Sequence, residues 1–183
     1  MNNKNIVLIG FMGCGKSVIG NELAKIFNFH FIDTDCIIEH QTNKTIEDIF
    51  NTFGETHFRK IEKQIYTDVS KMKNCVIATG GGVIKNVENI INLKKNGIII
   101  YLKATPEKIY DNLKFDDERP LLKNKNKFTT ICSLLNEREH LYNKHADIIF
   151  HVNDDSPFIL AKNIKATILN RWLYEKFNCY KWP

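Results

Sequence analysis

Residues 10–17 constrain the fold of this chain more than any other stretch. They read GFMGCGKS and fit the phosphate-binding loop pattern G-x-x-x-x-G-K-[ST]. The apolar run over residues 6–9 is typical of a buried parallel strand, and Ile19, Leu23 and Phe27 after the loop repeat at helical spacing. A strand, a glycine loop and a helix in this order direct backbone N–H groups and the positive end of the helix dipole at one point. The sequence therefore predicts that a nucleoside triphosphate binds here.

Each residue type in this loop has a different expected role in binding the phosphates. Glycines are needed because the backbone must turn tightly and approach the phosphates closely. Lys16 is expected to reach the β- and γ-phosphates, and the Ser17 hydroxyl is expected to ligate Mg²⁺. Cys14 is either a thiol whose pKa the helix N-terminus lowers or simply a small loop residue. The predicted ATP contacts are Gly13, Cys14, Gly15, Lys16, Ser17 and Val18.

Length and composition indicate one globular domain over residues 1–183. Hydrophobic residues make up 43% of the chain and charged residues 26%, which are ordinary values for a domain with a core. No apolar run approaches the roughly 20 residues that cross a bilayer, and Lys16 interrupts the N-terminal run too early for a signal peptide. The five cysteines form no C-x-x-C pair, which is typical of free thiols in a reducing compartment. We expect a cytoplasmic monomer without a membrane partner.

The net charge of +5 is spread along the chain. Its densest basic cluster, residues 123–127, alternates lysine with asparagine and is typical of a mobile loop. Nucleic-acid binding would show as a basic stripe with interleaved aromatic residues or as a known reading module. Neither pattern is visible, so we expect no nucleic-acid partner, and the positive balance suits anionic small substrates.

Strand and helix patterns alternate along the whole chain. Strands are expected over residues 6–9, 29–32, 75–78, 98–102 and 147–152. Thr45 and Thr105 are expected to cap the helices that follow them, and Gly54 breaks the first of these helices. The alternation predicts a P-loop three-layer α/β/α fold with a mostly parallel central sheet. We also expect a mobile lid at about residues 114–127 and an aromatic tail, about residues 172–183, that packs on the body.

Two aspartates and three glycines follow strand ends, where ligands bind in such sheets. Asp33 and Asp35 lie two apart in what reads as an extended segment, so both side chains would point the same way. Phosphoryl transfer needs a carboxylate near Mg²⁺ and another that orients or deprotonates the attacking hydroxyl. The alternative is that the two aspartates cap the next helix, and these two residues taken alone favour that alternative. Residues 80–82, all glycine, would permit close backbone approach to a ligand at the same edge.

Three arginines stand where an anion would pair with them. Arg138 falls on the apolar stripe of its helix, where a cation is costly unless a ligand anion or a carboxylate at the edge of the core pairs with it. Arg59 has Glu55 at i−4 and Glu62 at i+3, so it is either part of a helix-face ion pair or held rigid to grip a carboxylate. Arg119 lies in a polar, loop-like segment and is either a lid arginine for the transferred phosphoryl group or an exposed charge without function.

At these motifs the chain resembles the shikimate kinases, from residue 6 to about residue 168. The phosphate loop alone is shared by many kinases, whereas the other segments, in this order and at this spacing, are together highly specific. The matching segments are residues 10–17, 33–35, 54–62, 78–82, 119–122 and 138–147. The resemblance implies transfer of the γ-phosphoryl group of MgATP to the 3-hydroxyl of shikimate, a step of aromatic amino-acid biosynthesis.

The resemblance also implies roles for individual residues. Asp35 would hold and deprotonate the acceptor hydroxyl, while Arg59 and Arg138 would clamp the substrate carboxylate. Asp33 would lie near Mg²⁺ through water, and Arg119 would close with the lid and join Lys16 in catalysis and ATP binding. The remaining substrate contacts would be Gly80, Gly81 and Gly82, with the Gly81 N–H on a substrate hydroxyl.

One position departs from the family's pattern. The family commonly has an arginine that stacks on adenine where this chain has Asn112. The alternatives are that adenine contact passes to Lys108 or Lys114 or that ATP binds more weakly. The loop at residues 153–155, which the resemblance places near the adenine, is likewise not a close match. The alternatives are a P-loop kinase for another small polyol acid, such as gluconate, and a non-catalytic nucleotide-binding module. The complete set of catalytic positions disfavours the second.

Overall fold

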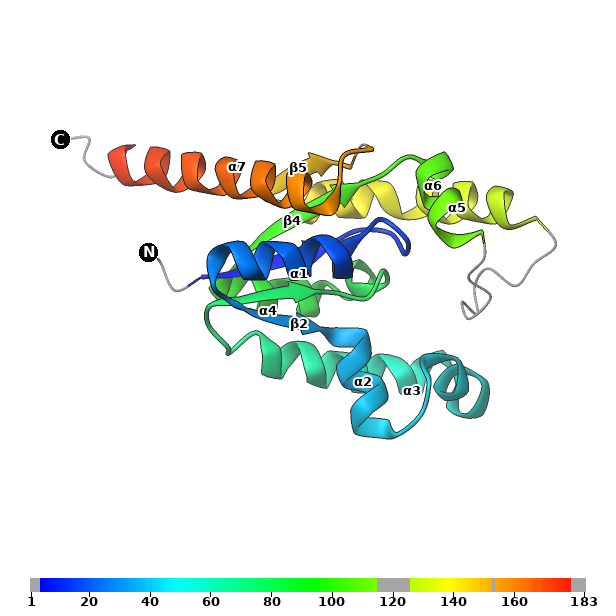
Figure 1. Ribbon diagram of the computed structural model, residues 1–183. Coiled ribbons are helices and arrows are strands. Elements are labelled where there is room, and N and C mark those ends of the chain that lie inside the picture. Colours follow the sequence, from blue (N-terminus) through cyan, green and yellow to red (C-terminus); the bar gives the residue numbers. More distant parts are fainter. Residues whose placement is uncertain (1–3, 115–125, 153, 179–183) are drawn as a thin grey trace.

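The computed structural model describes residues 4–114, 126–152 and 154–178, with side chains as far as residue 173. Its described strands form one parallel sheet in the order β2-β3-β1-β4-β5 (Figure 1). They are β1 (Asn5–Ile9), β2 (His30–Asp33), β3 (Cys75–Ala78), β4 (Gly97–Lys103) and β5 (Ile148–His151). Strand β1 lies between β3 and β4 and is buried throughout, which explains the apolar run before the loop.

Each face of the sheet carries its own hydrophobic core. On one face, Ile6 and Leu8 pack with residues of α1 and α7, and on the other, Val7 and Ile9 pack with residues of α3 and α4. The described helices are α1 (Lys16–Phe27), α2 (Thr34–Thr42), α3 (Ile46–Val69), the short η1 (Val83–Lys85), α4 (Val87–Asn96), α5 (Pro106–Leu113), α6 (Lys127–His145) and α7 (Pro157–Asn178). The predicted three-layer α/β/α fold is confirmed.

Capping residues begin the helices where the sequence predicts them. The Thr45 hydroxyl accepts a hydrogen bond from the Asp48 N–H at 3.0 Å, and the Thr105 hydroxyl accepts one from the Lys108 N–H at 3.3 Å. Gly54 interrupts α3 with φ 78° and ψ 169°, so the helix consists of two segments at an angle. Helices α2 and α3 lie at the opposite end of the molecule from α7 (Figure 1).

The expected C-terminal tail is largely a continuation of α7, which runs to residue 178. The Trp172 ring packs edge-on against Phe27, with ring centroids 6.2 Å apart, whereas Leu173 is exposed. The rest of the expected aromatic segment has no described side chains. Most of the expected lid, residues 115–125, also lies outside the described residues.

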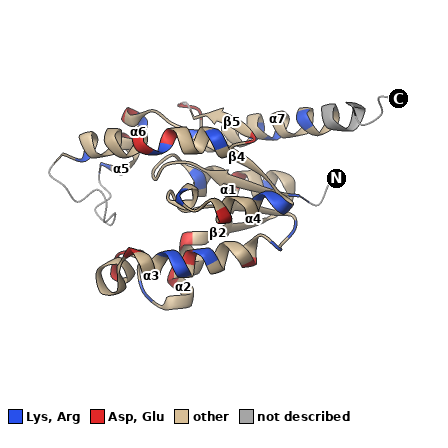
Figure 2. Cartoon of the chain, turned by 180° about the vertical axis from the view of Figure 1, so that it is seen from behind, with Lys and Arg blue, Asp and Glu red and all other residues tan. Residues whose placement is uncertain are grey.

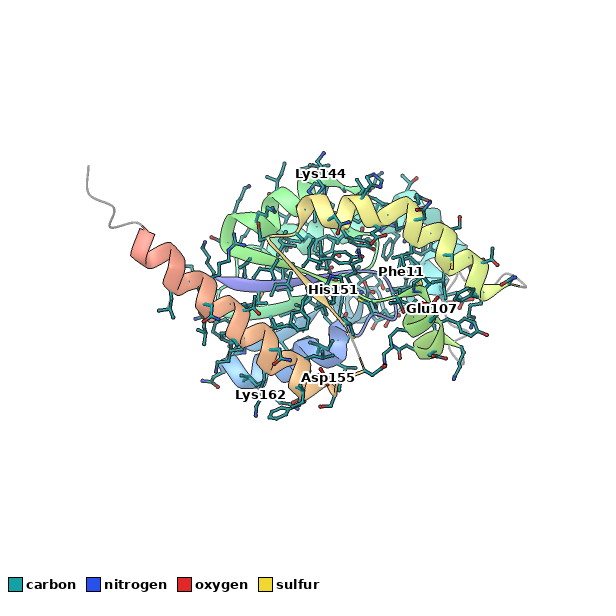
Figure 3. The ribbon with its side chains drawn as sticks, turned by 90° about the horizontal axis from the view of Figure 1, so that it is seen from above. Phe11, Glu107, Lys144, His151, Asp155 and Lys162 are labelled. Atoms are coloured by element: carbon teal, nitrogen blue, oxygen red, sulfur yellow. The ribbon has the colours of Figure 1, made fainter. Side chains whose placement is uncertain are left out.

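The view from above shows β5, with His151 at its end, between α6 and α7 (Figure 3). Lys and Arg residues are distributed over α1, α3, α4, α6 and α7 (Figure 2). Among the described residues, no helix combines the length and the apolar character that crossing a membrane requires.

Candidate active site

The carboxyl ends of β1, β2 and β3 meet around a cavity of about 230 Å³. This position is the one expected for ligands of an open α/β sheet. The predicted site residues that line it are Gly13, Gly15, Lys16, Ser17, Val18, Asp33, Asp35, Arg59, Gly80, Gly81, Gly82 and Arg138. Cys14 does not line the cavity, and Arg119 lies outside the described residues.

The phosphate loop follows β1 and turns through glycines with left-handed backbone. Gly13 has φ 76°, and a Cβ there would lie 2.6 Å from the Cγ of Leu113. Lys16 is buried, and its ammonium donates hydrogen bonds to the carbonyl oxygens of Gly10 (2.9 Å) and Phe11 (2.8 Å). The side chain therefore reaches across the loop that is expected to hold the phosphates.

The Cys14 thiol belongs to the hydrophobic core beneath the loop. It is 1% exposed, and its backbone N–H donates to the Phe11 carbonyl oxygen at 3.3 Å. Sγ is 3.7 Å from the Lys16 ammonium. The burial favours the interpretation of Cys14 as a small packing residue, because reactive thiols are partly exposed.

The two aspartates do not share an extended segment, so that expectation was wrong. Asp33 ends β2 and caps α2, with Oδ1 accepting from the N–H groups of Asp35 (3.1 Å) and Cys36 (3.5 Å). Because this cap starts the helix at once, Asp35 already lies in its first turn. The other carboxylate oxygen of Asp33 accepts from the Ser17 hydroxyl at 2.5 Å. Asp33 thus serves as the helix cap that the alternative proposed and also faces the predicted metal ligand.

Asp35 lies against the triple-glycine segment. A Cβ on Gly80 would stand 2.8 Å from Asp35 Oδ1 and 3.3 Å from Glu62 Oε1. A side chain at position 80 would therefore displace the Asp35 carboxylate and crowd that of Glu62. Asp35 and Glu62 approach one end of the cavity from α2 and α3.

Arg59 is held by the two glutamates on its own helix, and it also lines the cavity. Nη1 is 2.7 Å from Glu62 Oε2, while Nη2 and Nε are 2.9 and 3.2 Å from Glu55 Oε1. The guanidinium lies over Gly82, where a Cβ would be 2.6 Å from Nη1. The ion pair of the first interpretation is present, and it holds the guanidinium at the cavity wall; the grip on a substrate carboxylate stays a prediction.

Glu62 is a site residue whose position in the cavity wall the sequence did not reveal. It is 1% exposed, and Oε1 has no partner among the described residues. Burial raises the pKa of Glu62, against the opposing effect of the Arg59 charge. The hydrogen bond from Arg59 lowers the pKa of the exposed Glu55. The spacing to Arg59 was the available signal, but burial depends on the packing of α3 on the sheet.

Arg138 extends from α6 to the same cavity and is 2% exposed. Its guanidinium carbon is 5.8 Å from the centroid of the Phe11 ring, which Figure 3 shows near the centre of the molecule. Nε has no hydrogen-bond partner among the described residues, which also offer the side chain no salt bridge. The described residues thus do not provide the internal ion pair that was the alternative interpretation of Arg138. A buried cation of this kind is costly unless an anion binds beside it.

The residue at the adenine-stacking position and the two lysines considered in its place each contact another described residue. The Asn112 amide donates to the Gly13 carbonyl oxygen at 2.8 Å. The Lys108 ammonium is 2.7 Å from Asp154 Oδ1, and the Lys114 ammonium is 3.4 Å from Asp111 Oδ1. Position 112 therefore contacts the phosphate loop itself.

Comparison with known proteins gives, over most of the chain, the family that the sequence motifs resemble. The family model described as shikimate kinase matches residues 12–171. A shikimate kinase from Caldanaerobacter subterraneus subsp. tengcongensis is 47% identical over 161 residues, which cover 88% of this chain and 94% of the relative.

Solved structures agree. A shikimate kinase from Acinetobacter baumannii in complex with shikimate superposes with a TM-score of 0.89 at 36% identity, covering 92% of this chain and 94% of that one. A gluconokinase from Sinorhizobium meliloti covers 95% of this chain and 98% of its own with a TM-score of 0.55, but at 11% identity it shares only the fold. This chain belongs to the shikimate kinase family.

Proposed function

We propose that this chain transfers the γ-phosphoryl group of ATP to the 3-hydroxyl of shikimate, giving shikimate 3-phosphate and ADP. The observation that carries the proposal is Arg138, a buried cation that faces the phosphate-loop cavity without a salt bridge to any described residue. A small acceptor with a carboxylate would supply the missing anion. Membership of the family and the shikimate-bound relative support the same acceptor.

On the acceptor side, Arg59 and Arg138 hold the carboxylate of shikimate, with Arg59 kept in place by Glu55 and Glu62. Asp35 accepts the proton of the attacking hydroxyl, because it lies at the cavity wall between α2 and the triple-glycine segment. The N–H groups of Gly81 and Gly82 contact the substrate hydroxyls, and Gly80 lines the cavity beside them. This arrangement orients one hydroxyl for attack and excludes water from part of its surroundings.

On the donor side, Lys16 binds the β- and γ-phosphates after leaving the loop carbonyls that now accept from it. The Ser17 hydroxyl and the Asp33 carboxylate are hard oxygen donors 2.5 Å apart beside the loop, and they fit Mg²⁺, with Asp33 acting through water. When bound, Mg²⁺ neutralises charge on the phosphates. Arg119 approaches the transferred group from the lid.

We further infer that the chain works as a monomer in the cytoplasm, without nucleic acid or membrane partners. Four cysteines of the described residues are free thiols, which supports a reducing compartment.

The test is an ADP-release assay on the purified chain with MgATP and a panel of acceptors. We expect turnover with shikimate that far exceeds turnover with gluconate or nucleoside monophosphates. Gluconate turnover above that with shikimate would favour the kinase of another polyol acid. The absence of acceptor-dependent ADP release, with ATP still bound, would favour the non-catalytic module.

A further inference from the structure

The backbone groups of the triple-glycine segment are held from several sides. The Gly80 N–H lies 3.1 Å from the Tyr66 hydroxyl oxygen and 3.2 Å from the Thr34 hydroxyl oxygen. The Gly80 and Gly82 carbonyl oxygens accept from the N–H groups of residues 83 and 85, at 3.2 and 3.0 Å. The remaining carbonyl oxygen, that of Gly81, accepts from the Tyr142 hydroxyl at 2.5 Å.

This distribution leaves two donors for a ligand. Among the described residues, the N–H groups of Gly81 and Gly82 have no hydrogen-bond partner, and both glycines line the cavity. The Gly81 carbonyl and the Gly82 N–H belong to one planar trans peptide and point in opposite directions. When Tyr142 holds the carbonyl toward α6, it therefore turns the Gly82 N–H away from α6.

Tyr142 is well placed to fix this peptide. It is fully buried, and its ring stacks on that of Tyr101 with centroids 4.9 Å apart and planes at 20°. It follows Arg138 by one helical turn, so both side chains lie on the same face of α6. Burial raises the pKa of the Tyr142 hydroxyl, and the charge of neighbouring Arg138 opposes that rise, so the hydroxyl and the guanidinium lie close together. A hydroxyl that donates to the Gly81 carbonyl keeps lone pairs that can face a guanidinium, which places Tyr142 between the two groups.

We propose that Tyr142 is a positioning residue for shikimate binding, which fixes the Arg138 guanidinium and the Gly81–Gly82 peptide relative to each other. The inference rests on the proposed function, because it assumes that these groups bind the acceptor. Glycine backbone is conformationally free, and the buried Arg138 has no salt bridge to a described residue. The Tyr142 hydroxyl is therefore the contact that the Gly81–Gly82 peptide and Arg138 share.

The test is Tyr142→Phe, which keeps the ring and its stacking but removes the hydroxyl, and with it the hydrogen bond to Gly81 and the polar neighbour of Arg138. A net hydrogen bond contributes about a few-fold to tenfold in affinity, and one to a charged group more, so we expect the KM for shikimate to rise roughly tenfold or more. The KM for ATP and the kcat at saturating shikimate should stay within about twofold. Tyr101→Phe is the matched control, because it removes a hydroxyl from the same buried stack without contacting Gly81.

A double-variant cycle separates positioning from general packing. In an Arg138→Lys background, Tyr142→Phe should raise the shikimate KM less than it does in the wild type, because one of its two targets is already altered. An unchanged shikimate KM in Tyr142→Phe would overturn the inference, as would an equal loss in both KM values and kcat. Failure of the proposed function is distinguishable, since the wild type itself would then show no shikimate turnover.

Discussion

Arg138 and Arg59 line one cavity, and the same substitution should have opposite effects on stability at the two positions. Arg138 is 2% exposed and lacks a salt bridge to any described residue, so its charge is buried largely without compensation. In Arg138→Met, the unsatisfied donor and the desolvated charge disappear, and the long apolar side chain fills much of the space. An unsatisfied buried donor costs about 1–3 kcal/mol, and the lost cation–π contact with Phe11 offsets about 0.5–2 kcal/mol. We expect unchanged or increased stability, by up to about 2 kcal/mol.

In Arg59→Met, the substitution breaks a pair. The Nη1 atom of Arg59 is 2.7 Å from Glu62, which is 1% exposed and would be left as a buried carboxylate without its cation. Removing one partner of a buried pair costs about 3–5 kcal/mol, and the partial exposure of Arg59 reduces this figure. We expect a loss of about 2–4 kcal/mol. Such a loss lowers Tm by several degrees in a chain of this length.

Both variants should lose acceptor affinity. A charge-assisted contact is worth about 1.5–3 kcal/mol, so each should raise the shikimate KM by roughly ten- to a hundredfold while the ATP KM changes little. Chemical denaturation gives the two stabilities, and an ADP-release assay gives the two KM values. A loss of more than about 1 kcal/mol in Arg138→Met, with an unchanged shikimate KM, would show that Arg138 is a structural residue and refute the reasoning.

Four further predictions test other parts of the site and of the fold. Lys16→Met should abolish turnover and leave the unfolding transition intact, and near-normal turnover would exclude the phosphate-loop assignment. Asp35→Asn should lower kcat by about 10²–10⁴-fold, whereas Asp33→Asn should raise the Mg²⁺ concentration for half-maximal rate; Mg²⁺ titrations of both variants would show a reversed assignment. Asn112→Ala should raise the ATP KM and not the shikimate KM, because it removes the hydrogen bond to Gly13. Steady-state kinetics at varied ATP measure this change, and an unchanged ATP KM would contradict the prediction. Burial, followed by the charges of nearby lysines, lowers the pKa of His145 below 6.5, so the unfolded state takes up a proton at higher pH than the folded state does. The free energy of unfolding should therefore fall as the pH drops below about 6.5. This dependence of stability on pH should weaken in His145→Leu, and an identical dependence in that variant would exclude His145 as its source.

The parts of the fold that follow from neighbouring residues were predictable from the sequence. The phosphate loop needs only its own glycines and the strand and helix beside it, and the caps at Thr45 and Thr105 act within three residues. Asp35 was misplaced because an Asp-x-Asp segment reads equally well as a strand end and as a helix start. The Asp33 cap decides in favour of the helix.

The contacts that hold the phosphate loop and the triple-glycine segment join residues far apart in the sequence. Tyr142 reaches Gly81 from 61 residues away, and Asn112 reaches Gly13 from 99 residues away. No local pattern specifies such pairs, since they depend on how α5 and α6 pack across the strand ends. Residue types alone likewise could not show that Arg59 is paired and that Arg138 lacks a salt bridge within the described chain. The opposite stability effects predicted for the two substitutions rest on that difference.

The charges of the cavity explain why the reaction needs more than the residues that line it. Its charged side chains are three cations, which are Lys16, Arg59 and Arg138, and three carboxylates. The carboxylates are those of Asp33, Asp35 and Glu62. The wall is thus formally neutral, whereas ATP and a carboxylate-bearing acceptor bring only negative charge. Positive charge that enters with the substrates would therefore favour the binding of both in one cavity, in addition to the backbone N–H groups of the phosphate loop. A divalent cation at Ser17 and Asp33 and an arginine from outside the described wall, as proposed for Arg119, would supply the positive charge that the wall does not provide.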